Sequence, residues 1–113
     1  METLLKKRRK ELRLRQHNMA LRKLKIAIDF LYKEGATEVY LFGSITNPDT
    51  FTEHSDIDIA VKGISGDKRL TIEGKLADFL GNFEYDIIFL EEEETIRKDI
   101  RDKIKREAVL WSP

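Results

Sequence analysis

The chain has 113 residues, of which 41% are hydrophobic and 37% charged, with 21 basic and 21 acidic side chains and no cysteine. This length suits one domain with a single core, and the lack of cysteine excludes disulfides, cysteine-based zinc sites and thiol catalysis. No apolar run approaches the roughly 18 residues of a membrane span, and the charged N-terminus has no signal-peptide core. We therefore expect a soluble, cytoplasmic protein that does not contact a membrane.

The charges are unevenly distributed along the chain. Residues 1–25 carry a net charge of +8, residues 26–95 a net charge of −11, and residues 96–113 a net charge of +3. An acidic middle suits cations and does not by itself attract a nucleic-acid backbone.

A long helix is predicted over residues 2–34, which contain neither proline nor glycine. After His17, its apolar side chains recur at steps of three and four and form one core-facing stripe. Gly35 supplies a stop signal. The stripe consists of Leu21, Leu24, Ile28 and Leu31.

The first part of this helix has only a narrow apolar seam, formed by Leu5, Leu12 and Met19, beside the basic block Lys6–Lys10. We interpret residues 1–20 as a basic helical extension and residues 21–113 as the folded domain. A solvated extension is favoured over a nucleic-acid contact, and an arm that docks a partner remains an alternative.

The remaining predicted elements alternate between strands and helices. Asp67 is the expected N-cap of the middle helix, and the acids Glu91–Glu94 are expected to open the last one. The elements are a strand over 38–42, a loop over 45–54, a strand over 56–62, a helix over about 67–80, a strand over 83–90 and a helix over about 91–110. The middle helix should bury Leu70, Ile72, Leu76, Phe79 and Leu80. This order predicts an α/β (α+β) sandwich, a small mixed sheet with helices packed on it.

Three aspartates interrupt these apolar strands. Asp56 and Asp58 alternate along one strand and should share a face, and Asp86 lies within the next strand. An aspartate inside an apolar strand is disfavoured by both propensity and burial. Neighbouring carboxylates repel unless a cation lies between them, and magnesium prefers such oxygen ligands. A solvated strand end is the simpler reading of Asp56 and Asp58 alone, and a strand-end residue paired with a lysine is that of Asp86.

Gly43 and Ser44 follow the first strand. Glycine and serine end many strands, and the alternative is a phosphate cradle in which the backbone approaches an anion. His54, in the loop, is expected to be solvated rather than catalytic.

The run Phe42-Gly43-Ser44, followed after eleven residues by Asp56-Ile57-Asp58, with Asp86 on a later strand, resembles the signature of the minimal nucleotidyltransferases. This family, within the DNA polymerase β-like superfamily, includes the MntA-like antitoxins of HEPN toxin–antitoxin pairs. The resemblance extends from about Leu21 to Trp111. It implies a polymerase β-like nucleotidyltransferase fold. It further implies that Asp56, Asp58 and Asp86 are catalytic and hold two magnesium ions, and that Gly43 and Ser44 bind the β- and γ-phosphates of ATP or another nucleoside triphosphate.

The resemblance also implies a function. A nucleoside monophosphate, AMP if ATP is the donor, would pass to an acceptor hydroxyl on a HEPN-type helical partner, and the protein would act as the antitoxin. The run Ile45–Asp49 departs from the small and basic residues common after Gly-Ser in this family. The negative charge of the triphosphate would therefore be compensated by metals, by backbone N–H groups, or by Lys62, Lys68 or Arg69.

Other functions stay open at this point. The departure after Gly43-Ser44 favours a non-catalytic module that neutralises its partner by contact. An enzyme acting on a small molecule is a further option, without a visible substrate domain. Nucleic-acid binding through Lys6–Lys10 is possible but not favoured, and a homo-oligomer is possible.

Overall fold

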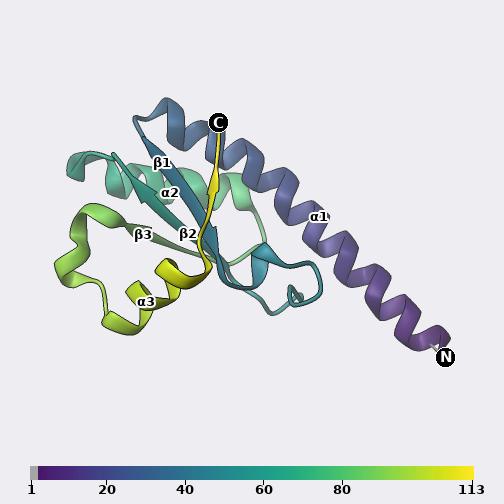
Figure 1. The fold of residues 1–113 in the computed structure, drawn as a ribbon. Coiled ribbons are helices and arrows are strands. Elements are labelled where there is room, and N and C mark those ends of the chain that lie inside the picture. The colour runs from purple at the N-terminus through teal and green to yellow at the C-terminus, as the bar shows by residue number, and fades with distance from the viewer. Residues whose placement is uncertain (1–2) are drawn as a thin grey trace.

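The computed structural model describes residues 3–113, except for the side chains of residues 92–94, and in this range the chain forms three α-helices and one four-stranded sheet (Figure 1). The molecule is elongated, with extents of 52 × 29 × 21 Å. The expected α+β class, with a mixed sheet and a long N-terminal helix, is confirmed. In chain order the elements are α1 (Leu4–Lys33), β1 (Glu38–Phe42), β2 (Ile57–Lys62), α2 (Arg69–Leu80), β3 (Tyr85–Phe89), α3 (Lys98–Glu107) and β4 (Val109–Trp111). Three short 3-10 helices cover Gly43–Thr46, Gly66–Lys68 and Leu90–Thr95.

The sheet has the strand order β3-β2-β1-β4. β1 runs antiparallel to both β2 and β4, whereas β2 and β3 are parallel. A parallel pair needs a crossover connection, and α2 provides it. The sheet is therefore mixed, and both α1 and α2 cover one of its faces while α3 lies toward the other (Figure 1).

The covered face contains the hydrophobic core. Val39, Leu41 and Ile59 are at most 1% exposed and pack beneath the predicted stripe of α1. Each fully buried side chain of this kind contributes about 1.5–3 kcal/mol relative to an exposed one. From α2, the side chains of Ile72, Leu76 and Leu80 join the core and that of Phe79 packs against it. The prediction that Leu70 is buried is wrong, because this residue lies in the first turn of α2 and is 82% exposed.

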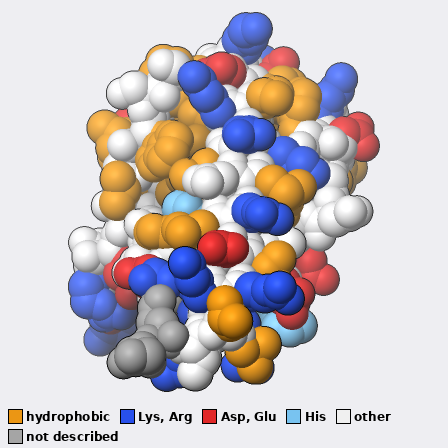
Figure 2. Space-filling view, turned by 90° about the vertical axis from the view of Figure 1, so that its right-hand side faces the viewer, with side chains coloured by type: hydrophobic (Ala, Val, Ile, Leu, Met, Phe, Trp, Pro, Cys, Tyr) orange, Lys and Arg blue, Asp and Glu red, His pale blue; other side chains and the backbone are white. Residues whose placement is uncertain are grey.

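The N-terminal half of α1 extends beyond the core (Figure 1). Thr3 caps the helix by accepting a hydrogen bond from the Lys6 N–H at 3.1 Å. Every side chain from Thr3 to Arg15 is exposed, and burial begins at Gln16 and His17. Viewed toward this end of the molecule, basic side chains gather with hydrophobic ones between them (Figure 2).

The C-terminal part differs from the prediction of one helix over about 91–110. α3 ends at Glu107, and Val109–Trp111 form β4 on the free edge of β1. This three-residue strand forms because the edge of β1 is open to pairing. A local sequence pattern does not reveal such an open edge. The residues Glu91–Glu94 belong to the preceding 3-10 helix rather than to α3.

The beginning of α2 also differs from the prediction, because Asp67 is not its N-cap. Lys68 occupies that position and makes no side-chain cap. The Asp67 carboxylate instead accepts a hydrogen bond from Ser65 Oγ. Across the described residues, no helix combines the length and the apolar character that a membrane crossing requires.

Candidate active site

A row of three side chains crosses the sheet on the face opposite the main core. Phe42 of β1 pairs in register with Asp58 of β2, and Asp58 pairs with Asp86 of β3. Residues paired across neighbouring strands project from the same face, so the two aspartates lie side by side. Asp56 lies one residue before β2 rather than within it. The structure therefore brings Asp58 and Asp86 together and leaves Asp56 at the adjoining strand entrance.

Asp58 has the most perturbed environment of these carboxyl groups. It is half-buried, whereas Asp56 and Asp86 are exposed. Burial raises the pKa of Asp58 from 3.8 to about 6; Lys103 opposes this rise, and the negative charges of Asp86, Asp56 and Glu107 add to it. A half-buried carboxyl whose pKa is raised mainly by burial, with further acids beside it, is typical of a functional site that gathers negative charge for a cation.

Gly43 fits closely against this carboxylate. Its φ of +76° is in the left-handed region, and a Cβ at this position would overlap Asp58 Oδ2. Both constraints require glycine. The turn that follows is held by side-chain bonds to its backbone: Thr46 Oγ1 donates to the Gly43 carbonyl at 2.7 Å, and Thr50 Oγ1 donates to the Ser44 carbonyl at 3.3 Å. Ser44 is half-buried beside them.

α1 anchors the same turn from the other side. His17 is only 7% exposed, its Nε2 lies 2.8 Å from the Ile45 carbonyl oxygen, and its ring packs edge-on against Phe51 at 5.7 Å. A buried hydrogen bond of this kind fixes the backbone directly after Ser44. The sequence prediction did not assign a role to His17.

Two further charged residues at the site, Lys103 and Glu107, were missed by the sequence prediction. They project from α3 and, together with Gly43, Ser44, Thr46, Asn47 and Thr50, line a cavity of about 470 Å³. Lys103 Nζ lies 5.9 Å from the centre of the Phe42 ring. Lys103 and Glu107 are spaced by four on a helix, beside the isoleucines of its apolar stripe, and this spacing was the available signal.

None of the basic residues proposed to meet the triphosphate charge lies at this cavity. Lys62 pairs with Glu38 in the sheet register at the other end of β2. Lys68 Nζ is 3.7 Å from Glu34, and the Arg69 guanidinium lies 4.9 Å from the centre of the Phe89 ring. The structure places all three away from Gly43, because β2 runs from Asp58 toward Lys62 and the chain continues from that end to Lys68 and Arg69.

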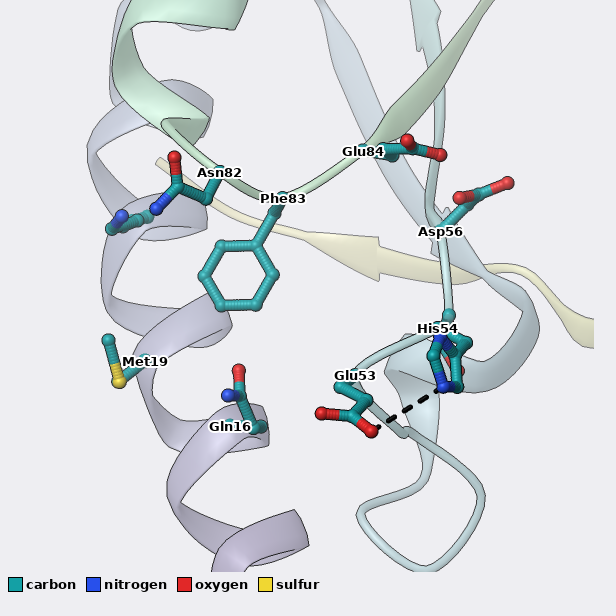
Figure 3. Close-up of a pocket in the computed structure, with 10 residues that line it drawn as sticks. Gln16, Met19, Glu53, His54, Asp56, Asn82, Phe83 and Glu84 are labelled. Carbon is teal, nitrogen blue, oxygen red and sulfur yellow. Dashed lines mark ion pairs between the residues drawn. The ribbon is translucent and has the colours of Figure 1, made fainter.

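A second cavity, of about 410 Å³, lies between α1 and the residues that precede β2 and β3 (Figure 3). The Phe83 ring faces it, and Lys23 Nζ lies 5.3 Å from the centre of that ring. Asp56 and Glu84 border it on the side away from α1. His54 is 88% exposed and lies 3.4 Å from Glu53, in agreement with the expected solvated loop histidine. The other lining residues are Gln16, Met19, Ser55 and Asn82.

The three aspartates are the candidate ligands for a metal ion. Across the described residues, no three His, Asp or Glu side chains converge at ligand distances. The chemistry of the donors nevertheless suits magnesium, since all three groups offer carboxylate oxygens. Asp58 lies against Gly43, and Asp56 and Asp86 are exposed. The described residues therefore offer a cation suitable donor groups, although not an assembled set of ligands.

The chain is similar to nucleotidyltransferases both in sequence and in fold. Residues 25–111 match the family described as polymerase beta, nucleotidyltransferase. No curated protein sequence matches the chain. Among solved structures, a Shewanella oneidensis MNT antitoxin complex with its tri-AMPylated HEPN toxin aligns with a TM-score of 0.54 and 24% identity, over 84% of this chain and 73% of the other. A protein provisionally named as a minimal nucleotidyltransferase aligns with a TM-score of 0.57 and 25% identity, over 79% and 88%. A provisionally named nucleotidyltransferase of Sulfolobus solfataricus gives 0.53 and 20%, over 87% and 84%.

Proposed function

Because the chain belongs to the polymerase beta nucleotidyltransferase family, we propose that it transfers AMP from ATP to a hydroxyl group on a HEPN-type partner protein and acts as its antitoxin. The observation that supports transfer is the pairing of Asp58 with Asp86 beside Gly43. The described complex of an AMPylated HEPN toxin with an MNT antitoxin supports the choice of donor and partner.

The aspartates and the glycine turn have separate roles in this proposal. Asp56, Asp58 and Asp86 would hold two magnesium ions, which supply charge stabilisation to an in-line displacement when bound. Gly43 and Ser44 bind the β- and γ-phosphates of the triphosphate. The exposed Asp86 carboxylate orients the acceptor hydroxyl and takes its proton. The acceptor oxygen forms a bond to the α-phosphorus, the bond to the bridging β-phosphate oxygen breaks, and pyrophosphate leaves.

The acceptor approaches from the cavity of Figure 3. In an in-line displacement the nucleophile attacks opposite the leaving group. If pyrophosphate leaves on the Gly43 side, the acceptor enters from the opposite side of Asp58, where Asp86 lies in register and where Glu84, two residues before Asp86, lines this second cavity. Its acidic border, which includes Glu53, Asp56 and Glu84, favours a neutral or cationic segment around the acceptor hydroxyl over a phosphate.

The basic extension over residues 1–20, ahead of the domain over 21–113, is the proposed docking arm for the partner. Its leucines are exposed without a partner inside the described chain, with Leu5 60% and Leu12 59% exposed. An exposed apolar seam rimmed by cations suits a helical partner with an acidic rim.

The experiment that tests transfer incubates the protein with α-labelled ATP, magnesium and the HEPN-type partner. Label should appear on the partner with the wild-type protein and disappear with Asp58→Asn. The exposed Asp78→Asn variant is the matched control, because Asp78 lies on α2 away from the site and should leave labelling unchanged.

The alternative is neutralisation by contact alone. The absence of a basic residue in Ile45–Asp49 favours it. Partner activity that remains suppressed by Asp58→Asn, with no label transferred by the wild-type protein, would establish this alternative and end the catalytic proposal.

A further inference from the structure

We propose that Lys103 binds the triphosphate chain of the nucleotide and supplies the basic side chain that the turn after Gly43 lacks. This inference rests on the proposed function for the identity of the ligand. Its own basis is the position of an ammonium group over the Gly43 turn, contributed by a helix about 60 residues further along the chain.

Lys103 belongs to the side of α3 that faces the sheet. It is half-buried together with Ile100, Ile104 and Glu107, which share its helical face at spacings of three and four. The residues between them, such as Arg101, Lys105 and Arg106, are exposed. Lysine is among the residues least often buried, so its place on the covered side of a helix needs a reason at that location.

The surroundings of Lys103 Nζ offer an anion site. A Cβ built on Gly43 would lie 3.6 Å from this nitrogen, which places the ammonium directly beside the turn. The Phe42 ring lies beneath it at 5.9 Å. The cavity in front is lined by Ser44, Thr46 and Thr50, and because both threonine hydroxyls donate to backbone carbonyls, the Ser44 hydroxyl is the donor that a ligand can use. An ammonium combined with neutral donors is the chemistry that recognises phosphate oxygens.

Lys103 is also available for such a ligand. Among residues 3–91 and 95–113, no acidic side chain lies within the 4.0 Å of an ion pair with its Nζ. Asp58 attracts it at longer range, and that carboxylate would be occupied by the metal in the working site. The ammonium can then turn its hydrogen bonds to the phosphates.

A competing role for Lys103 is that it replaces the metal as the permanent counter-charge of Asp58. The two roles predict different binding properties. A phosphate-binding lysine contributes to the affinity for a triphosphate and not to that for AMP, which ends at the α-phosphate. A lysine that replaces the metal contributes to neither, and its removal would only strengthen magnesium binding.

The test measures binding by calorimetry in magnesium for three probes: a non-hydrolysable α,β-methylene ATP, AMP, and inorganic tripolyphosphate. Lys103→Met should weaken both polyphosphate probes by roughly tenfold to a hundredfold, the scale of a lost charged hydrogen bond, and change AMP affinity less than about twofold. Lys103→Arg, which keeps the charge, should recover most of the affinity. Lys105→Met is the matched control on the exposed side of α3 and should bind like the wild type.

The outcomes separate this inference from the proposed function. Equal loss for all three probes would show a structural role and overturn the assignment, as would unchanged polyphosphate binding or tighter magnesium binding as the sole effect. Lys103→Gln repeats the measurement if the methionine variant unfolds. Selective loss of polyphosphate affinity in a protein that transfers no label would retain Lys103 as a phosphate ligand and reject the transfer reaction.

Discussion

At the residue scale, the half-buried Asp58 carboxylate destabilises the folded protein when it is ionised. Its pKa is raised by burial to about 6, so its contribution to folding is fully present below the unfolded value of 3.8 and is lost as the pH rises through about 6. In metal-free protein at pH 7.5, we expect Asp58→Asn to raise the free energy of unfolding by on the order of 1 kcal/mol after allowance for solvent screening. Thermal unfolding in EDTA at pH 7.5 and at pH 4 measures this gain, which should disappear at the lower pH.

Magnesium should make the wild-type protein more stable than Asp58→Asn, the reverse of their order in EDTA. Ligand binding to the native state stabilises it, so magnesium should raise the Tm of the wild type and leave that of Asp58→Asn nearly unchanged. An equal rise in both proteins would show that the cation binds elsewhere.

Gly43 carries a second prediction at this scale. Gly43→Ala forces a Cβ into the left-handed region and against the Asp58 carboxylate. We expect a loss of about 1–3 kcal/mol in unfolding free energy and the loss of label transfer. Gly66→Ala is the matched control, because its added Cβ meets nothing within 4 Å. Wild-type stability in Gly43→Ala would contradict the described turn.

At the scale of elements, one hydroxyl joins the long helix to two strands. Tyr32 of α1 donates to the Trp111 carbonyl of β4 and accepts a hydrogen bond from the Val39 N–H of β1 at 3.2 Å. Tyr32→Phe should cost about 1–2 kcal/mol, because it leaves a part-buried N–H and carbonyl unpaired. Denaturant unfolding measures the change. Tyr85→Phe serves as the comparison and should cost less, since its bond to the Glu73 carbonyl is exposed.

A substitution in α2 should instead raise the free energy of unfolding. Gly74 lies inside this helix, and an added Cβ would meet nothing within 4 Å. Alanine in a helix interior is favoured over glycine by about 0.5–1 kcal/mol. Gly74→Ala should raise the midpoint of denaturant unfolding by the corresponding amount without changing label transfer, and a lower midpoint would indicate a contact that the structure does not contain.

For the molecule as a whole, the proposed docking role of the N-terminal extension can be tested separately from the stability of the domain. Removing residues 1–14 deletes, within the described range 3–14, only exposed side chains and leaves the His17 bond to Ile45 in place. We expect the Tm to change little and the affinity for the HEPN-type partner to fall at least tenfold, with a weaker dependence on salt. A pull-down and titration with the shortened protein measure both, and unchanged partner binding would remove the docking role.

Elements with local signals could be predicted from the amino-acid sequence. The stripe Leu24, Ile28 and Leu31 has a helical period, Phe42-Gly43-Ser44 ends a strand, and the aspartates stand out from apolar strands because their placement is costly. These features were sufficient to predict a mixed sheet with helices and an acidic site. They also located Gly43, whose need for glycine is a backbone property.

Contacts between residues far apart in the sequence depend on the packing of the folded chain. β4 exists because β1 has an open edge, and Asp58 lies beside Asp86 because α2 returns the chain in parallel register. Lys103 reaches Gly43 because α3 folds back over the sheet, whereas Lys62 is carried to the other end by the direction of β2. Periodicity specifies which face of an element is buried, but long-range pairing depends on the packing of the whole chain.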